Sequence, residues 1–143
     1  MTNVRVFFDP GGPGTCSVVG SLNVSLYGTN SPNEKIKLGQ NATGDTDGNV
    51  DAVYLPLPST SYTFHVVGNS LRLKVGNDIK FKFTGVFSNS ESKKFVFANG
   101  STSYTRNGVN AFIGGIAVPV GESAAASLAF TVDTSETYAL AGF

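Results

Sequence analysis

The chain has 143 residues, with ten Lys and Arg balanced by ten Asp and Glu. A chain of this length usually forms one domain around one core, so we expect a single domain over residues 1–143. Zero net charge excludes the basic excess of a general nucleic-acid binder. Only 14% of the residues are charged, and this favours strands over helices, because helix surfaces draw on Glu, Lys and Arg.

The first predicted element is a strand at residues 4–8, followed by a Gly/Pro-rich arm that ends near residue 14. Such a strand can pair within its own sheet or reach a neighbouring subunit, and both alternatives stay open. The start of the chain lacks the pattern of a secretory signal, and no segment has the roughly 18 apolar residues of a membrane helix. We therefore expect neither a signal peptide nor a membrane partner.

Apolar and polar residues then alternate along most of the chain, which places them on opposite faces of β-strands. The clearest cases are residues 16–27 and 78–87. Weaker alternation occurs at residues 62–67, 71–75, 94–98, 112–119, 127–133 and 138–140, with short pieces near residues 36 and 53. Turn-forming residues separate these segments. The pattern predicts an all-β fold, an antiparallel β-sandwich of roughly nine or ten strands.

No catalytic constellation stands out. His65 is the only histidine and Cys16 the only cysteine, and a Cys16/His65 dyad is the alternative on which an enzymatic hypothesis would rest. Alternation predicts that His65 is a partly exposed strand residue and that Cys16 is a small, buried apolar residue. We expect no enzymatic activity and no cofactor.

One segment has part of a calcium-loop pattern. Asp45, Asp47 and Asp51 surround Gly48 at alternating positions, as oxygen ligands do around a tight turn. The first aspartate of such a loop and its bidentate Glu are missing, and an acidic Asp-Gly turn explains the same residues. The turn is the preferred interpretation, with calcium as the alternative.

A predicted hairpin at residues 71–87 carries Arg72, Lys74, Lys80 and Lys82 on one face. Single-stranded nucleic acid sites need aromatic rings among such cations, but alternation sends the phenylalanines to the other face. We interpret these cations as a solvated surface, with an anionic protein or glycan as the alternative partner.

Residues 64–100 read FHVVGNSLRLKVGNDIKFKFTGVFSNSESKKFVFANG. This segment, with Gly76-Asn77-Asp78, Gly85 and Lys93-Lys94, resembles a stretch of small β-rich bacteriophage virion proteins. The resemblance covers about a quarter of the chain and implies a jelly-roll-like sandwich of the head decoration, spike or fibre type. The chain is also similar in length and composition to chaperone–usher pilins, but it lacks their signal peptide and cysteine pair.

The resemblance implies a structural virion protein, made in the host cytoplasm, that contacts other virion proteins and itself as a homo-oligomer such as a trimer. Candidate interface residues are apolar and out of phase with their strands' core faces or near chain ends: Phe7, Val19, Tyr27 and Phe143. The alternative is a glycan- or receptor-binding adhesin module. Loop tyrosines such as Tyr104 would then replace the tryptophan that this chain lacks.

Overall fold

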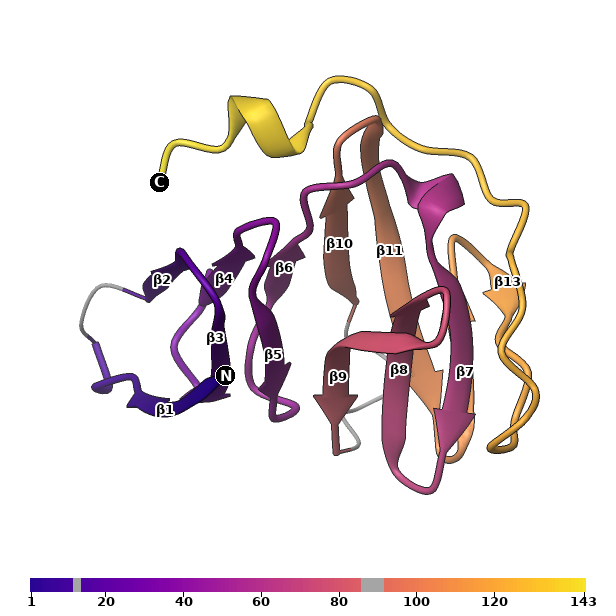
Figure 1. Cartoon of the computed structure of the whole chain (residues 1–143), viewed down its shortest axis with the longest axis horizontal. Helices are drawn as coiled ribbons and strands as arrows, with labels where there is room; N and C mark the ends of the chain where they lie inside the picture. The colour runs from indigo at the N-terminus through magenta and orange to yellow at the C-terminus, as the bar shows by residue number, and fades with distance from the viewer. Residues whose placement is uncertain (12–13, 86–91) are drawn as a thin grey trace.

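Thirteen β-strands form two sheets in the computed structural model, which describes residues 1–11, 14–85 and 92–143 (Figure 1). The first six strands are β1 (Thr2–Phe7), β2 (Thr15–Val18), β3 (Leu22–Tyr27), β4 (Lys35–Leu38), β5 (Thr43–Thr46) and β6 (Ala52–Tyr54). The other seven are β7 (Thr63–Val67), β8 (Ser70–Val75), β9 (Asp78–Thr84), β10 (Lys93–Phe97), β11 (Gly100–Asn107), β12 (Asn110–Ile113) and β13 (Ile116–Ala117). Two single-turn 3₁₀ helices lie at Ser59–Ser61 and Tyr138–Leu140. The described residues contain no helix with the length and apolar character needed to cross a membrane.

The strands divide into a six-stranded sheet and a seven-stranded sheet. The six-stranded sheet has the order β1-β3-β5-β9-β8-β7, and the seven-stranded sheet has the order β13-β12-β11-β10-β6-β4-β2. Both sheets are mixed, because the strands up to β6 pair in parallel and most later strands pair antiparallel. The all-β prediction is confirmed, but antiparallel pairing throughout is wrong.

The first half of the chain, β1 to β6, winds as stacked coils in which successive strands alternate between the two sheets. Parallel partners in the first two coils are 20 residues apart, as in Thr2 with Leu22 and Thr15 with Lys35. A ladder of polar side chains follows the same spacing: Asn23 Nδ2 donates to Asn3 Oδ1 at 3.1 Å, and Thr43 Oγ1 donates to Asn23 Oδ1 at 2.8 Å. We call β1 to β6 the coil half.

The coil half explains why residues 16–27 are not one strand. The chain leaves the seven-stranded sheet after Val18 and enters the six-stranded sheet at Leu22. Gly20 lies at the corner with φ of +75°, a conformation that glycine adopts without steric cost. Residues 19–21 at this corner are exposed. The alternation before and after the corner belongs to two strands, β2 and β3, which face the same core from opposite sheets.

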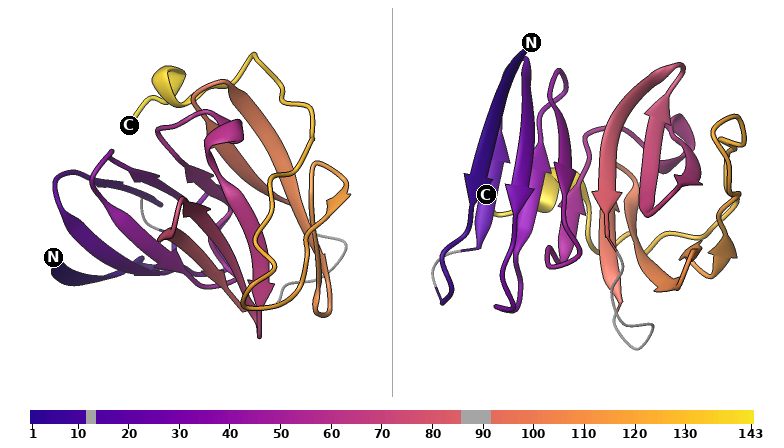
Figure 2. Two further views of the ribbon diagram at one scale, coloured as in Figure 1. Left: turned by 45° about the vertical axis from the view of Figure 1, so that its right-hand side comes forward. Right: turned by 90° about the horizontal axis from the view of Figure 1, so that it is seen from below.

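The second half contains the antiparallel strands that the sequence predicts. β7, β8 and β9 form two consecutive hairpins, and β10 to β13 form three more antiparallel pairs. Parallel pairs of β5 with β9 and of β6 with β10 join this half to the coil half. Figure 2 shows the coil strands stacked at one end of the molecule and the antiparallel strands at the other. Phe87 and residues 88–91 of the predicted strand and turn lie outside the described residues.

The core lies between the two sheets and runs through both halves. Its centre is a cluster of fully buried aromatic rings, in which neighbouring centroids are 5.0–6.4 Å apart, mostly edge to face. The members of this aromatic cluster are Phe64, Phe81, Phe83, Phe95, Phe97 and Tyr104. Rings in these geometries contribute beyond the area that they bury.

The C-terminal segment, residues 118–143, runs back from β13 across the molecule to the side of the coil half (Figure 1). Backbone bridges join it to β7 and to Ser101. It ends with Tyr138 and Phe143 packed on the outer face of the seven-stranded sheet, near Tyr54 and Val96. The strands predicted at residues 127–133 and 138–140 are wrong, because this segment makes isolated bridges and a 3₁₀ turn instead.

Burial of Tyr62 predicts a loss of stability at high pH. Burial raises the pKa of its hydroxyl from 10.0 to about 12, although the Leu57 N–H donates to it. Below pH 10 the hydroxyl is protonated in both states, so stability is unaffected. Between about pH 10 and 12 the unfolded chain loses the proton first, and this residue removes about 1.4 kcal/mol of stability per pH unit. Urea denaturation from pH 8 to 11.5 is expected to show a flatter pH profile for Tyr62→Phe than for the wild type.

Candidate functional site

A cleft of about 580 Å³ lies on the outer face of the seven-stranded sheet. Ala52, Tyr54 and Ser103 belong to its strands, and the C-terminal segment adds Asp133 and Glu136. Its polar lining comprises Lys35, Asp51, Lys93, Lys94, Asp133 and Glu136 together with the hydroxyl groups of Ser92, Ser101, Thr102 and Ser103. We call it the sheet cleft.

Two lysines of the sheet cleft are already paired with carboxylates. Lys93 Nζ lies 3.3 Å from Asp51 Oδ1, and Lys94 Nζ lies 2.8 Å from Glu136 Oε1. Burial and the neighbouring Glu136 carboxylate both raise the pKa of Tyr54. Hydrogen bonds from Ser135 lower the pKa of Asp133. Pairs of opposite charge that are fixed before a ligand arrives suit recognition of a polar partner.

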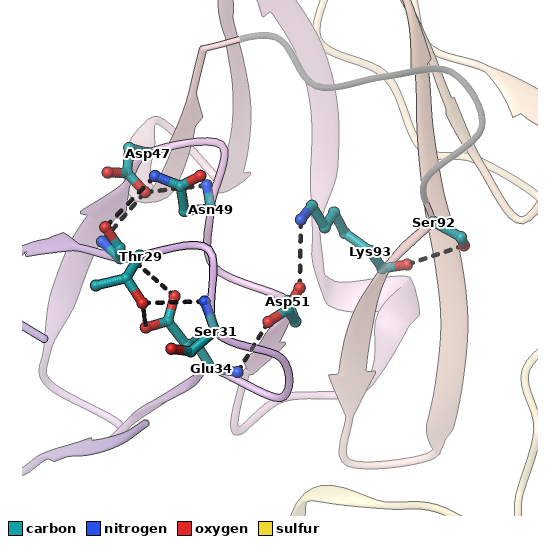
Figure 3. Close-up of polar contacts among 9 residues, drawn as sticks. Thr29, Ser31, Glu34, Asp47, Asn49, Asp51, Ser92 and Lys93 are labelled. Atoms are coloured by element: carbon teal, nitrogen blue, oxygen red, sulfur yellow. Dashed lines mark hydrogen bonds and ion pairs between the residues drawn. The ribbon is translucent and has the colours of Figure 1, made fainter. Parts of the chain in front are cut away.

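A polar corner at one end of the cleft is built around the buried carboxylate of Glu34 (Figure 3). Glu34 accepts hydrogen bonds from Thr29 N at 2.6 Å and Thr29 Oγ1 at 2.8 Å. Its own N–H donates to Asp51 Oδ2 at 2.9 Å, and Asp51 also pairs with Lys93. A Cβ on Gly28 would lie 2.8 Å from Glu34 Oε1, so a larger residue would push this carboxylate from its position. Glu34 thus fixes the loops that border the cleft.

Sequence reasoning missed Glu34, although a signal was present. Glu34 is in phase with Ile36 and Leu38, which point into the core. A charged residue at a core position indicates a buried polar network. The same signal applies to Arg106, which is in phase with Tyr104 on β11 and fully buried.

The three aspartates of the calcium-loop pattern bond to different partners. Asp45 Oδ2 accepts from Ser25 Oγ at 2.9 Å, and Asp47 Oδ1 accepts from the N–H groups of Gly28 and Asn49. Asp51 accepts a hydrogen bond from the Glu34 N–H and forms an ion pair with Lys93. Within the described ranges, no group of three or more His, Cys, Asp or Glu side chains is placed to hold a metal ion.

Cys16 and His65 lie far apart in the strand order. Cys16 is on β2, which ends the seven-stranded sheet on the coil side, whereas His65 is on β7 at the opposite end of the other sheet. The prediction that His65 is partly exposed is wrong, since only 1% of it is exposed. Its Nδ1 lies 2.9 Å from the carbonyl oxygen of Gly121, a residue of the C-terminal segment. The two residues form no dyad.

Comparison with protein-family models, curated proteins and solved structures found no match to this chain.

The four candidate interface residues have different surroundings. Phe7 and Val19 are 67% and 74% exposed, and Tyr27 is 39% exposed. The rings of Phe7 and Tyr27 stack at 4.7 Å across β1 and β3. Phe143 is instead half-buried, because its ring packs edge to face on Tyr54 at 5.1 Å.

Tyr104 was the tyrosine expected in a binding loop, and this expectation is wrong. It is fully buried in the aromatic cluster, and its hydroxyl accepts a hydrogen bond from Arg106 Nη1 at 3.3 Å. Of the five tyrosines, only Tyr27 is exposed. The predicted basic face of the β8–β9 hairpin is present only in part. Arg72 lies opposite Lys82 and pairs with Glu122, but a register shift after Leu73 places Lys74 opposite Ile79. Lys80 instead lines a small hollow with Leu55 and Tyr62.

The first coil leaves an apolar layer uncovered. β1 and β2 are edge strands on the same side of the molecule. Four apolar side chains on or beside these strands are only half-buried, namely Val4, Val6, Phe8 and Cys16, although Val18 of β2 is 3% exposed. In the next coil, the register partners of Val4, Val6 and Cys16 are at most 2% exposed: Val24, Leu26 and Ile36. We call this side, formed by β1 and β2, the open end.

Proposed function

We propose that this chain is a non-enzymatic structural subunit of a bacteriophage virion, of the capsid decoration, spike or fibre type. The observation that supports this role best is the open end. Stacked-coil proteins normally carry a polar cap over each end of the stack. Here two edge strands and a half-buried apolar layer share one side, and such a surface favours association with another protein.

The jelly-roll expected from the sequence belongs to this proposal and applies to the antiparallel half alone. A jelly-roll consists of antiparallel strands, so the parallel coils have no counterpart in it. In the proposal, the antiparallel half supplies a stable body and the coil half supplies the contact surface. The subunit would be made in the host cytoplasm and would function in the virion.

Purified particles from the source test this role. Mass spectrometry is expected to find the chain in the particles, and electron microscopy is expected to place its density against neighbouring subunits. An Arg5→Asp variant, which changes the charge at the open end, is expected to be incorporated less than a matched Asp78→Arg variant at the β8–β9 turn. Absence of the wild-type chain from every particle or filament would contradict the proposal.

A second candidate role is recognition of a host-surface glycan or receptor, and the sheet cleft favours it. Its hydroxyl groups and fixed ion pairs offer both donors and acceptors to a polar ligand. Ser103 is exposed on the cleft floor. In a glycan array, Ser103→Arg is expected to abolish binding, whereas Val109→Arg on the β11–β12 turn is expected to leave it intact. Absence of any glycan binding by the wild type would argue against this candidate.

A further inference from the structure

The open end has unused backbone hydrogen-bonding groups along β1. The N–H of Phe8 donates to the carbonyl oxygen of Tyr27 on β3. Successive residues of a strand direct their N–H and C=O groups to opposite sides. Asn3, Arg5 and Phe7 therefore direct theirs away from β3, toward the open edge. Such an edge pairs readily with another extended strand.

The order of charges on this edge is self-complementary. The residues whose backbone faces outward run Asn3, Arg5, Phe7 and then Asp9, directly after the strand. Arg5 and Asp9 are the charged residues between positions 2 and 9, and both are exposed. If an identical strand runs antiparallel with Phe7 opposite Phe7 of the other copy, each Arg5 lies opposite an Asp9. Opposite charges at directly facing positions stabilise a strand pair, and like charges destabilise it.

The second edge strand offers no obstacle to the same contact. β2 has the sequence TCSV and carries no charge. The apolar layer beneath the two edges contains Val4, Val6, Phe8 and Cys16, which another identical layer would cover. With zero net charge, two copies also approach without overall repulsion.

We propose that the open end binds a second copy of this chain in a two-fold symmetric dimer, in which the two β1 strands pair antiparallel about Phe7. This inference rests on the proposed function, because it names the first partner of the surface that supports that function. A two-fold axis makes the contact closed, so it yields a dimer and not an open filament. Each Arg5–Asp9 pair then occurs twice in the interface.

A charge swap tests the pairing register. Sedimentation equilibrium is expected to show a dimer for the wild type. Arg5→Asp and Asp9→Arg are each expected to raise the dimer dissociation constant by about tenfold or more at low salt, because two facing pairs become repulsive. The double variant is expected to restore wild-type affinity. Asp78→Arg reverses an exposed charge at the start of β9, away from the open end. It is the matched control and is expected to leave the dimer dissociation constant unchanged.

Hydrogen exchange gives an independent measurement on the wild-type dimer. The amides of Arg5 and Phe7 are expected to exchange more slowly as protein concentration rises. A chain that stays monomeric at about 0.1 mM, a double variant that remains as weak as the single variants, or amides that stay unprotected in the dimer would each overturn the inference. If the chain is monomeric but is still found in particles, the dimer inference fails and the virion proposal stands. If the chain forms charge-sensitive dimers but is absent from particles, the virion proposal fails and the dimer inference stands.

Discussion

Replacing Phe95 with alanine is expected to lower the free energy of unfolding by about 3–5 kcal/mol, the range for deleting a buried aromatic ring. Phe95 is fully buried on β10, and its ring lies 5.5–6.4 Å from four others: Phe81, Phe83, Phe97 and Tyr104. β10 pairs in parallel with β6 of the coil half and antiparallel with β11. The cavity would therefore open where the two halves meet, so neither half can relax into it without shifting the other.

Urea denaturation followed by circular dichroism measures this loss. Phe95→Leu keeps most of the volume and is expected to cost less than half as much. Phe7→Ala removes the same group from an exposed position, where the monomer loses only the stacking on Tyr27, and at concentrations that keep the chain monomeric it is expected to cost about 1 kcal/mol. Equal losses for Phe95→Ala and Phe7→Ala would contradict the central place assigned to the aromatic cluster.

The second large effect is expected at Arg106, whose replacement by alanine should cost about 3 kcal/mol. Its guanidinium is fully buried and donates to the carbonyl oxygens of Gly108 and Asn69 at 3.0 and 3.2 Å and to the Tyr104 hydroxyl at 3.3 Å. Alanine would remove these three hydrogen bonds from a charged donor and would also create a cavity, although the Asn69 carbonyl oxygen keeps the hydrogen bond from the Gly85 N–H. Asn69 lies in the β7–β8 turn, so Arg106 ties the two sheets together at this end.

A double-mutant cycle separates the hydroxyl contact from the rest. Tyr104→Phe removes the hydroxyl alone and is expected to cost about 1 kcal/mol in the wild type. In the Arg106→Ala background the same change is expected to cost less, because the hydroxyl has already lost this donor. Thermal and urea denaturation of the four proteins provide the comparison. A loss below about 1 kcal/mol for Arg106→Ala would show that the buried guanidinium contributes little.

Alternation was sufficient to predict the fold class but not the strand pairing. A period of two places side chains on opposite faces whether neighbouring strands are parallel or antiparallel, so the coil half could not be distinguished from hairpins by this signal. The 20-residue spacing is visible only over two repeats. In the third coil, Gly44 stands opposite Val24 and Ala52 pairs with Lys35 after only 17 residues. The repeat is too short and too irregular to stand out.

Most of the errors at the candidate sites arise because residues distant in the sequence cover side chains that the local pattern assigns to solvent. His65 is on the face of β7 that alternation assigns to solvent, but a carbonyl 56 residues later in the chain covers it. Tyr104 is near turn residues in the sequence, yet its strand continues to Asn107 and its ring points into the core. Phe143 likewise packs back onto β6. None of these contacts follows from local pattern, whereas the exposure of Phe7 and Val19 does.

The C-terminal segment sets an order in which the molecule can form. Tyr138 donates its hydroxyl hydrogen bond to the Leu38 carbonyl oxygen across 100 residues, and Lys37 Nζ reaches the Phe143 carbonyl oxygen across 106. Neighbouring coils need close loops of only about 20 residues, and shorter loops lose less chain entropy. The coils and hairpins can thus form while a ribosome is still synthesising the chain. Packing of residues 138–143 over β4 and β6 must wait until these residues have emerged, and protection of Tyr54 and Val96 from solvent would report that step.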